Sequence, residues 1–359
     1  MQKKRIVIKI GSNVITRSDG KLDVTRMSAI VDQAAWLHAK GYDVILVSSG
    51  AVASGRGELK VKRRLDSVAQ RQLYSALGQA KLINLYYDLF REYHIHVGQV
   101  LTMKENFSSR RQYLNQRECM TVMLDNGVIP IVNENDTVSV TELMFTDNDE
   151  LSGLIASMMG AETLIILSNI DGIYDGSPAD PQSKVITRVE SGTDLSTYIQ
   201  EERSGFGRGG MQTKYNIARK VAEEGIRVII ANGKRDNILP LLLEHPEDTP
   251  HTEFAPAVDE VTGIKKWIAH SNSFAKGTIT VSAPARDALC GPRAVSLLPV
   301  GVIAVDGDFE EGDLVGINDE NGQRIAVGRI ACDSDIAREV MGKHDQKPLI
   351  HYDYLYIES

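Results

Sequence analysis

The stretch Arg5–Asn13, RIVIKIGSN, decides the fold, because a short and mostly apolar run ends abruptly in a Gly-Ser-Asn turn. The run has the length of a buried strand, and a helix-period segment at 23–41 separates it from a second run, YDVILVSSG at 42–50. The alternation continues through IHVGQVLT (95–102), VIPIVNEND (128–136), TLIILSNIDGIY (163–174) and IRVIIANG (226–233). Continuous apolar strands alternating with helices predict an open, mostly parallel α/β sheet with helices on both faces.

The pattern changes after residue 255. Short β-rich runs follow, separated by the turns DGD (306–308), EGD (311–313) and ENG (320–322). Such runs predict a small, barrel-like β domain. We therefore predict a first domain at 1–255, a linker at 256–274 and a β domain at 275–359.

The composition is that of an ordinary globular chain with enough material for two domains: 359 residues, 42% hydrophobic, with a net charge of −8. The negative charge argues against a general nucleic-acid binder. No apolar run approaches the roughly 18 residues of a membrane span, and the N-terminal run lacks a cleavage site, so we expect no membrane segment or signal peptide. Cys119, Cys290 and Cys332 lack C-x-x-C spacing, so we expect plain thiols in a reducing compartment, the cytoplasm.

Several strands are expected to end at a common site, because ligands of open parallel sheets lie beyond the carboxyl ends of the strands. Lys9 stands near the end of the first strand among residues that should be buried. A buried lysine without a partner is costly, so Lys9 is expected to face an anion. The alternative is an edge lysine whose ammonium group reaches solvent.

The stretch GFGRGGMQTK (205–214) contains a literal G-x-G-x-x-G, but the segment before it is polar and acidic instead of a buried strand. Neither a dinucleotide fold nor a P-loop is therefore indicated. A helix-period segment follows, so the glycines open a helix whose N-terminus favours an anion, with Lys214 in its first turn. A plain flexible loop remains the alternative at this point.

Two further segments concentrate polar groups. Ser49 and Gly50 follow the second strand and could hold a phosphate or a carboxylate, although a plain turn explains them equally well. The segments NENDTV (133–138) and FTDNDEL (145–151) concentrate acids and amides. These groups could bind an ammonium group, order nearby lysines or assist Mg²⁺, and Asn148 or Asp149 could cap the helix that follows.

Histidine is absent from all of these loops, since the eight histidines stand at 38, 94, 96, 245, 251, 270, 344 and 351. Phosphorylation of an alcohol usually needs a base, whereas a carboxylate nucleophile is already ionised near neutral pH. Lysines and a metal without a base suit acyl-phosphate synthesis, in which the main barrier is to bring two anions together.

Taken together, the motifs resemble those of the amino acid kinase family. The segments VIKIGSN, VSSGAVASGR, HVGQVL, VIPIVNENDTV, DNDELSGLIA, GRGGMQTK and KKWI occur in the order expected for that family, and SLLPVGVIAVDGDFEEGDLV resembles a PUA domain. The resemblance covers nearly the whole chain. It is most specific for the branch of the family that phosphorylates the side-chain carboxylate of L-glutamate with ATP and Mg²⁺, the committed step of proline synthesis.

The resemblance also implies roles for individual residues. It assigns phosphoryl transfer to Lys9, Lys214 and Asp149. It assigns glutamate binding to Ser49, Asp136, Asn148 and Asp147. It assigns ATP binding to Lys9, Gly11, Gly50, Ser168, Asn169, Arg208, Gly209, Gly210, Met211, Gln212, Thr213 and Lys214. Proline as a feedback inhibitor and a homo-oligomeric assembly are further implications, whereas the protein ligands of Mg²⁺ stay unassigned.

One departure from the family pattern concerns LSNIDG (167–172), which stands where many members have Thr-Asp. Asn169 therefore lacks a charge, for which Asp171 could compensate. Other kinases of the family, acting on acetylglutamate, aspartate or carbamate, share the sheet and the lysines, and a non-catalytic amino-acid sensor would share the fold. They are the alternatives to a glutamate kinase.

PUA domains bind RNA elsewhere, but residues 275–359 carry 8 Lys and Arg against 14 Asp and Glu, a balance of −6. Phosphate contacts supply most nucleic-acid affinity, so this acidity argues against RNA binding by the tail. A structural or regulatory role is expected instead.

Overall fold

The computed structural model describes residues 4–59, 65–108, 110–139, 145, 147–178, 180–190, 193, 195, 198, 210–257, 275–291 and 295–357. The chain divides into two compact units, one made of residues 1–103 and 118–260 and the other of residues 104–117 and 261–359. Most of the predicted linker, 258–274, lies outside the described residues. The predicted boundaries at 255 and 275 stay predictions.

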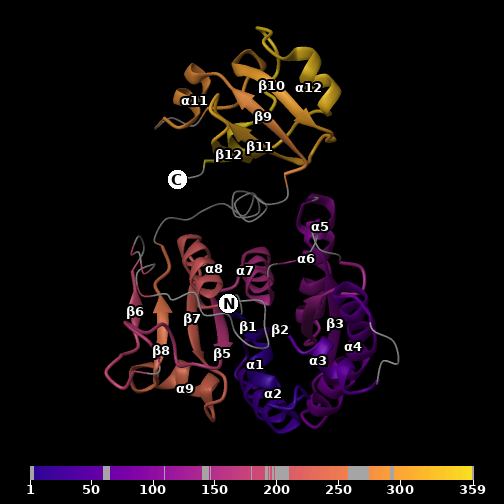
Figure 1. Ribbon diagram of the computed structural model, residues 1–359, viewed down its shortest axis with the longest axis vertical. Coiled ribbons are helices and arrows are strands. Elements are labelled where there is room, and N and C mark those ends of the chain that lie inside the picture. Colours follow the sequence, from indigo (N-terminus) through magenta and orange to yellow (C-terminus); the bar gives the residue numbers. More distant parts are fainter. Residues whose placement is uncertain are drawn as a thin grey trace. The chain divides into compact units, whose positions relative to one another are not determined.

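The first unit is built on an eight-stranded sheet with the order β3-β4-β2-β1-β5-β7-β8-β6. Its strands are β1 (Arg5–Ile10), β2 (Asp43–Ser48), β3 (Val97–Thr102), β4 (Ile129–Glu134), β5 (Thr163–Ser168), β6 (Arg188–Val189), β7 (Arg227–Asn232) and β8 (His251–Phe254). The strands from β3 to β7 in this order are parallel, whereas β8 is antiparallel to β7. The predicted mostly parallel sheet is therefore confirmed (Figure 1).

Helices cover both faces of this sheet. They are α1 (Ser12–Ile15), α2 (Val24–Ala39), α3 (Ala51–Arg56), α4 (Ser67–Arg91), α7 (Asn148–Met159), α8 (Met211–Glu223) and α9 (Ile238–Glu244). Two more helices are α5 (Lys104–Ser108) and α6 (Arg110–Asp125). One boundary between the two units falls within α6, at residues 117 and 118. The long amphipathic segments of the sequence thus form the helices expected of them.

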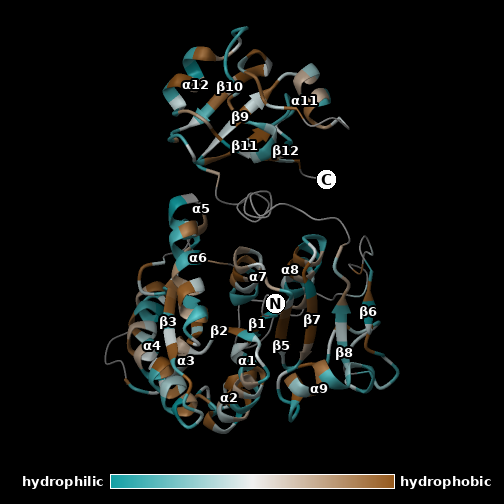
Figure 2. Cartoon of the chain, turned by 180° about the vertical axis from the view of Figure 1, so that it is seen from behind, coloured by the Kyte–Doolittle hydropathy of each residue, from teal (hydrophilic) through white to brown (hydrophobic). Residues whose placement is uncertain are grey.

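The alternation of side chains along the strands explains which helices lie on which face. Ile6, Ile8 and Ile10 of β1 belong to a core cluster with buried residues of α2, α4 and α9. Because successive side chains of a strand point to opposite faces, Val7 and Lys9 point to the other face, where α7 contacts β1, β2 and β5. Figure 2 shows the central strands β5 and β7 as hydrophobic, as strands buried on both faces must be.

The topology places a ligand site at the end of β1. This strand pairs with β2 on one side and with β5 on the other. The strands that follow β1 first extend the sheet on the β2 side, and from β5 onward they extend it on the opposite side. Ligands of open α/β sheets bind at such a switch point, beyond the carboxyl ends of the strands. Here these ends carry Gly11, Ser49 and Asn169.

The second unit contains a five-stranded sheet with the order β10-β9-β11-β12-β13. Its strands and helices are β9 (Gly277–Val281), α11 (Ala283–Leu289), β10 (Val302–Gly307), β11 (Leu314–Asn318), β12 (Arg324–Arg329), α12 (Ser334–Val340) and β13 (Leu355–Ile357). Its core is a cluster of its own, formed around Ile279, Val315 and Ile317. A separate small β domain, as predicted, is therefore present.

No helix in the described ranges is long and apolar enough to span a bilayer.

The approach of α3 to α4 generates a test of the packing. A Cβ atom added at Gly78 of α4 would lie 1.7 Å from the carbonyl oxygen of Ala51, and one added at Gly55 of α3 would lie 1.8 Å from that of Tyr74. We expect Gly78→Ala to separate the helices and to lower the free energy of unfolding by about 3 kcal/mol, the upper end of the usual cost of overpacking. Urea unfolding measures this loss.

The control for Gly78→Ala is Ala76→Ser, on the exposed side of the same helix. This change is expected to stay within about 0.5 kcal/mol of the parent. Equal stabilities of the two variants would show that the helices separate at little cost.

Candidate active site

Two lysines that are far apart in the sequence meet at one carboxylate. Lys9 Nζ lies 2.6 Å from Asp149 Oδ1, and Lys214 Nζ lies 3.0 Å from Asp149 Oδ2. All three side chains are buried, with exposed fractions of 5% for Lys9, 9% for Lys214 and 1% for Asp149. The expectation that Lys9 is an interior lysine with an anionic partner agrees with this geometry.

Each of the three side chains is positioned by a different element. Lys9 projects from the face of β1 that α7 covers. Asp149 lies in the first turn of α7, and Lys214 lies in the first turn of α8, which begins after Gly210. The segment GFGRGGMQTK thus ends in the first turn of a helix, as expected, while residues 199–209, including Arg208 and Gly209, lie outside the described residues.

The two acids at the start of α7 have opposite electrostatic environments. Burial alone would raise the pKa of Asp149, but the charges of Lys9 and Lys214 outweigh it, so this pKa is lowered. Burial and the neighbouring charge of Asp149 raise the pKa of Asp147. Asp149 is therefore held as the anion that orders the two lysines.

Asp147 also caps the helix. Its Oδ1 accepts hydrogen bonds from the N–H groups of Asp149 at 2.8 Å and Glu150 at 3.1 Å. The expectation that Asn148 or Asp149 is the cap is thus wrong, because both already lie within the first turn. The other carboxylate oxygen, Asp147 Oδ2, is buried and has no hydrogen-bond partner in the part of the chain that the structure describes.

The turn after β2 is tied to the same helix. Asn148 Nδ2 donates to Ser49 Oγ at 3.1 Å, to the carbonyl of Ser48 at 3.3 Å and to Asn133 Oδ1 at 3.0 Å. Gly50 adopts φ 106°, a conformation that favours glycine, and a Cβ there would lie 3.0 Å from Ile15 Cδ1. The strand ends of β2 and β4 are therefore joined through the Asn148 amide.

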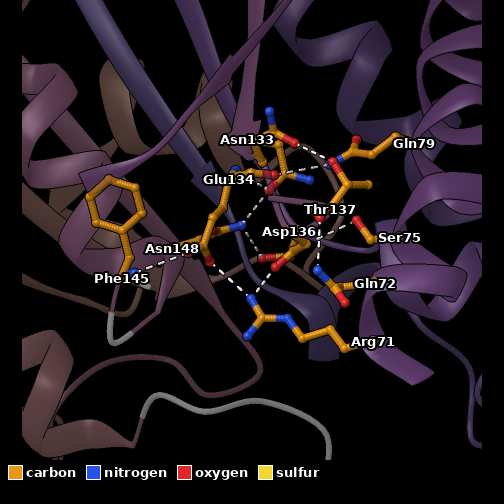
Figure 3. A network of polar contacts seen from close by, with 12 residues as sticks. Arg71, Gln72, Ser75, Gln79, Asn133, Glu134, Asp136, Thr137, Phe145 and Asn148 are labelled. Atoms are coloured by element: carbon orange, nitrogen blue, oxygen red, sulfur yellow. Dashed lines mark hydrogen bonds and ion pairs between the residues drawn. The ribbon is translucent and has the colours of Figure 1, made fainter. Parts of the chain in front are cut away.

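A second charged cluster lies at the end of β4 (Figure 3). Arg71 of α4 forms ion pairs with Glu134, at 3.0 Å, and with Asp136. Ser75 Oγ donates to Asp136 Oδ2 at 3.2 Å, and the N–H group of Phe145 donates to Glu134 Oε1 at 3.0 Å. Burial, followed by the charge of Asp136, raises the pKa of Glu134 to about 7, against the lowering effect of Arg71.

A cavity of about 500 Å³ connects these groups. The predicted site residues among its lining are Lys9, Gly11, Ser49, Gly50, Asp136, Asp147, Asn148, Asp149, Ser168, Asn169, Gly210, Met211 and Lys214. Gln212 and Thr213 are not among the lining residues, and Gln212 bonds instead to Asn216 on the same helix. The structure thus gathers most of the predicted residues around one cavity, while their individual roles stay predictions.

The loop after β5 shows which groups pair with the carboxylate of Asp171. Both carboxylate oxygens of Asp171 pair with Arg235, at 2.7 and 2.8 Å, and Asn232 adds a hydrogen bond at 3.0 Å. Asn169 lines the cavity, whereas Asp171 is not among the lining residues. Asp171 is therefore placed to hold the loop, and not to replace a charge at Asn169.

Arg71 is the prominent site residue that the sequence analysis missed. It belongs to a polar row on α4, Arg71, Ser75 and Gln79, with the i, i+4, i+8 spacing of one helix face. Arg71 bonds to Glu134 and Asp136, Ser75 bonds to Asp136, and Gln79 bonds to Glu134. This row of polar residues was the sequence feature that could have indicated Arg71. A polar helix face usually meets solvent, however, and only the fold shows that this face meets a loop.

No cluster of three or more His, Cys, Asp or Glu side chains is arranged to hold a metal ion within the described ranges.

The fold and the cavity define a class of protein, and the comparisons with known proteins agree with it. Residues 4–232 match the amino acid kinase family, and residues 277–352 match the PUA domain. The chain belongs to the amino acid kinase family and carries a C-terminal PUA domain. A carbamate kinase from Giardia lamblia bound to AMP-PNP shares the fold, with a TM-score of 0.52 at 14% identity over 71% of this chain and 99% of that chain.

Relatives with higher sequence identity to this chain come from one group of enzymes within the family. The chain is 66% identical to a glutamate 5-kinase of Bacteroides thetaiotaomicron, over 99% of this chain and 98% of that protein. It is 45% identical to a glutamate 5-kinase of Chlorobaculum tepidum, over 99% of this chain and 97% of that protein. Both relatives span the kinase and PUA regions together.

The contrast between Asp147 and Asp149 can be tested by matched substitutions. Asp149→Asn leaves two buried ammonium groups without their partner, so we expect a loss of about 3–5 kcal/mol in the free energy of unfolding at pH 7. Asp147→Asn keeps a good N-cap and removes a carboxylate whose surroundings disfavour the charged form. We therefore expect the free energy of unfolding to change by no more than about 1 kcal/mol.

The pH dependence gives a second measurement on the same pair. Because the pKa of Asp147 is raised on folding, its contribution to stability is lost as the pH rises through that pKa. In Asp147→Asn the free energy of unfolding should therefore fall less steeply as the pH is raised toward neutrality than it does in the parent. Equal losses in the two variants at pH 7 would contradict the electrostatic assignment.

Proposed function

We propose that this protein transfers the γ-phosphoryl group of ATP to the side-chain carboxylate of L-glutamate. The products are ADP and L-glutamate 5-phosphate, and the reaction is the first step of proline biosynthesis. The observation that carries the proposal is the convergence of Lys9 and Lys214 on Asp149 at one cavity. The 66% identity to a glutamate 5-kinase over nearly the whole chain supports the choice of substrate.

The chemistry follows from charge. Phosphoryl transfer between ATP and a carboxylate requires two anions to approach, and negative charge spreads over the transferring group. Two ammonium groups held in place by Asp149 need no reorganisation to meet that charge. The acceptor carboxylate is already ionised near neutral pH, so no general base is needed. We assign Lys9 and Lys214 to the transferring phosphoryl group and Asp149 to their orientation.

Glutamate carries an ammonium group and carboxylates, so its site needs both negatively charged groups and hydrogen-bond donors. Its ammonium group matches the carboxylates of Asp136 and Asp147, and the buried Oδ2 of Asp147 has no hydrogen-bond partner among the described residues. Its side-chain carboxylate matches the hydroxyl of Ser49 and the amide of Asn148, which lie 3.1 Å apart. These roles place the acceptor carboxylate on the side of the cavity that Lys9 occupies.

ATP is assigned to the remaining lining. Gly11 and Gly50 let the backbone approach the phosphates, and the N-terminus of α8 at Gly210 and Met211 presents backbone N–H groups that favour an anion. Ser168 and Asn169 are assigned to the nucleotide. Mg²⁺ prefers phosphate oxygens with one or two carboxylates, and the carboxylates that line the cavity fit such an ion, while no single residue is assigned to it. When bound, the ion supplies further neutralisation of the phosphates.

Three further expectations belong to this proposal. L-Proline carries the same α-carboxylate and α-amine as glutamate, so it is proposed to act as a feedback inhibitor at or near the glutamate site. A cytoplasmic location and a homo-oligomeric assembly are retained as predictions. For the PUA domain we retain a structural or regulatory role, because its net acidity disfavours phosphate contacts.

The experiment that tests the function is coupled ADP release with a panel of acceptors. L-Glutamate is expected to support turnover far better than N-acetylglutamate, aspartate or carbamate. Turnover with one of the other acceptors alone would make the protein a different kinase of the family. Glutamate binding without turnover in the presence of Mg²⁺ and ATP would make it a sensor.

Removal of either lysine should affect the chemical step. We expect Lys9→Ala and Lys214→Ala each to lower kcat on the order of 100- to 1000-fold, the usual effect of removing a group that stabilises transition-state charge. Lys40→Ala is the control, because Lys40 forms an exposed ion pair with Glu244. Steady-state rates with saturating ATP and glutamate measure the effect, and mild losses in both lysine variants would refute the assignment.

Removal of Asp136 should affect substrate binding instead. A lost hydrogen bond to a charged group corresponds to about 1.5–3 kcal/mol, so Asp136→Ala should raise the KM for glutamate roughly ten- to hundredfold. The KM for ATP should change little. A fall in kcat of the size seen for the lysine variants, at an unchanged KM for glutamate, would place Asp136 in the wrong role.

A further inference from the structure

One face of α4 is bonded to the loop that follows β4 (Figure 3). Besides Arg71 and Ser75, Gln79 Nε2 donates to the carbonyl of Glu134 at 3.2 Å, and Gln72 Nε2 donates to the carbonyl of Thr137 at 2.9 Å. Four side chains from adjacent turns of one helix thus hold three residues, Glu134 at the end of β4 and Asp136 and Thr137 in the loop. Only Arg71 among these four carries a charge.

We propose that Arg71 is a positioning residue for the amino-acid substrate, which holds Glu134 and Asp136 together as a pair and directs Asp136 toward the substrate ammonium group. This inference rests on the proposed function and adds to it a residue of α4. Arg71, Glu134 and Asp136 all line the cavity, so the cluster is part of the site and not a remote brace.

The charges of the cluster support this role. Two carboxylates side by side in a buried site repel one another, and one of them would bind a proton if no cation lay between them. The same terminal nitrogen of Arg71, Nη2, contacts both Glu134 and Asp136. With Arg71 in place, the cluster carries one negative charge in excess, which one substrate ammonium group neutralises.

The geometry also favours arginine over lysine here. Glu134 and Asp136 are buried at 3% and 7% exposure, and a guanidinium group is more weakly hydrated than an ammonium group and presents several donors in a fixed plane. Ser75 donates to the second oxygen of Asp136, so both oxygens of this carboxylate have a partner from α4. The orientation of Asp136 is therefore determined by α4.

Glu134 extends the effect of Arg71 to the other substrate residues. Its Oε1 accepts the N–H group of Phe145, a buried residue that precedes Asp147 and Asn148 by a few positions. Arg71, Glu134 and Phe145 thus connect α4 to the segment that begins α7. Loss of Arg71 is expected to disturb the glutamate side of the cavity more than the lysine side.

The titration of Glu134 provides a readout that a purely structural role would not move. Charged groups face it from α4, as Arg71, and from its own loop, as Asp136. With a pKa of about 7, Glu134 gains a proton as the pH falls through neutrality, and the cluster then loses its excess negative charge. The KM for glutamate should therefore rise as the pH falls below about 7.

The first test compares Arg71→Gln with Lys81→Gln. Lys81 lies on the same helix and forms an ion pair with Glu58 in which both side chains are about half exposed, so its loss should leave the kinetics unchanged. Arg71→Gln is expected to raise the KM for glutamate on the order of tenfold or more, with kcat and the KM for ATP within about threefold of the parent. Equal increases in both KM values would overturn the proposal.

The second test follows the KM for glutamate between pH 6 and pH 8.5. Removal of Arg71 takes away the cation that lowers the pKa of Glu134, so in Arg71→Gln the rise should move to higher pH. In Glu134→Gln the part of the rise due to Glu134 should vanish. Asp147 remains in every variant, so differences between the profiles report on the Arg71 cluster. Coincident profiles for the parent and Arg71→Gln would refute the positioning role.

Two milder variants keep the proposal testable if Arg71→Gln does not fold. Arg71→Lys keeps the charge without the planar donors, and Ser75→Ala removes a neutral partner of Asp136. Each should raise the KM for glutamate by a few-fold with kcat retained. An unchanged KM in both would contradict the proposal. Absence of glutamate-dependent turnover in the parent enzyme would instead refute the proposed function, so the two failures are distinguishable.

Discussion

The structure depends on one buried carboxylate that holds two buried ammonium groups. An isolated charge in a protein interior is strongly destabilising, and Asp149 forms ion pairs with both Lys9 and Lys214. The three groups come from β1, α7 and α8, so this contact joins a central strand to the two helices on one face of the sheet. It leaves one positive charge in excess beside the cavity. That excess is what an incoming phosphate can use.

The other charged cluster of the cavity has the opposite sign. Glu134 and Asp136 share the cation Arg71, and these three groups together leave one negative charge in excess. A cavity with a positive and a negative side orients a molecule that carries an anion and a cation at its two ends, which is the charge pattern of an amino acid with an acidic side chain. The acceptor carboxylate then faces the lysines, and the ammonium group faces Asp136. Orientation of this kind is the main contribution that a protein makes to phosphoryl transfer.

The sequence predicts the centre of the sheet well because strands such as β1 and β5 are buried on both faces and are therefore mostly apolar. Lys9 is conspicuous for the same reason, since a charge within such a strand needs a partner. Arg71 cannot be found in this way, because arginine on a helix is usually solvated and the face that meets the loop after β4 is decided by tertiary packing. The cap of α7 shows a local limit: Asp147, Asn148 and Asp149 are all good capping residues, and only the backbone of Asp147 is extended.

The loop after β5 shows how a change of one residue is absorbed. Asn169 contributes a neutral amide to the cavity where the resemblance to the family led us to expect a carboxylate, and the nearby Asp171 directs its charge toward Arg235 and Asn232. Hydrogen bonds from Arg235 lower the pKa of Asp171, so it remains ionised and paired. The nucleotide side of the cavity therefore receives no negative charge from this loop. The acids of the cavity stand instead at the end of β4 and at the start of α7, where Asp136 and Asp147 are placed to attract the substrate ammonium group and Asp149 is neutralised by the two lysines.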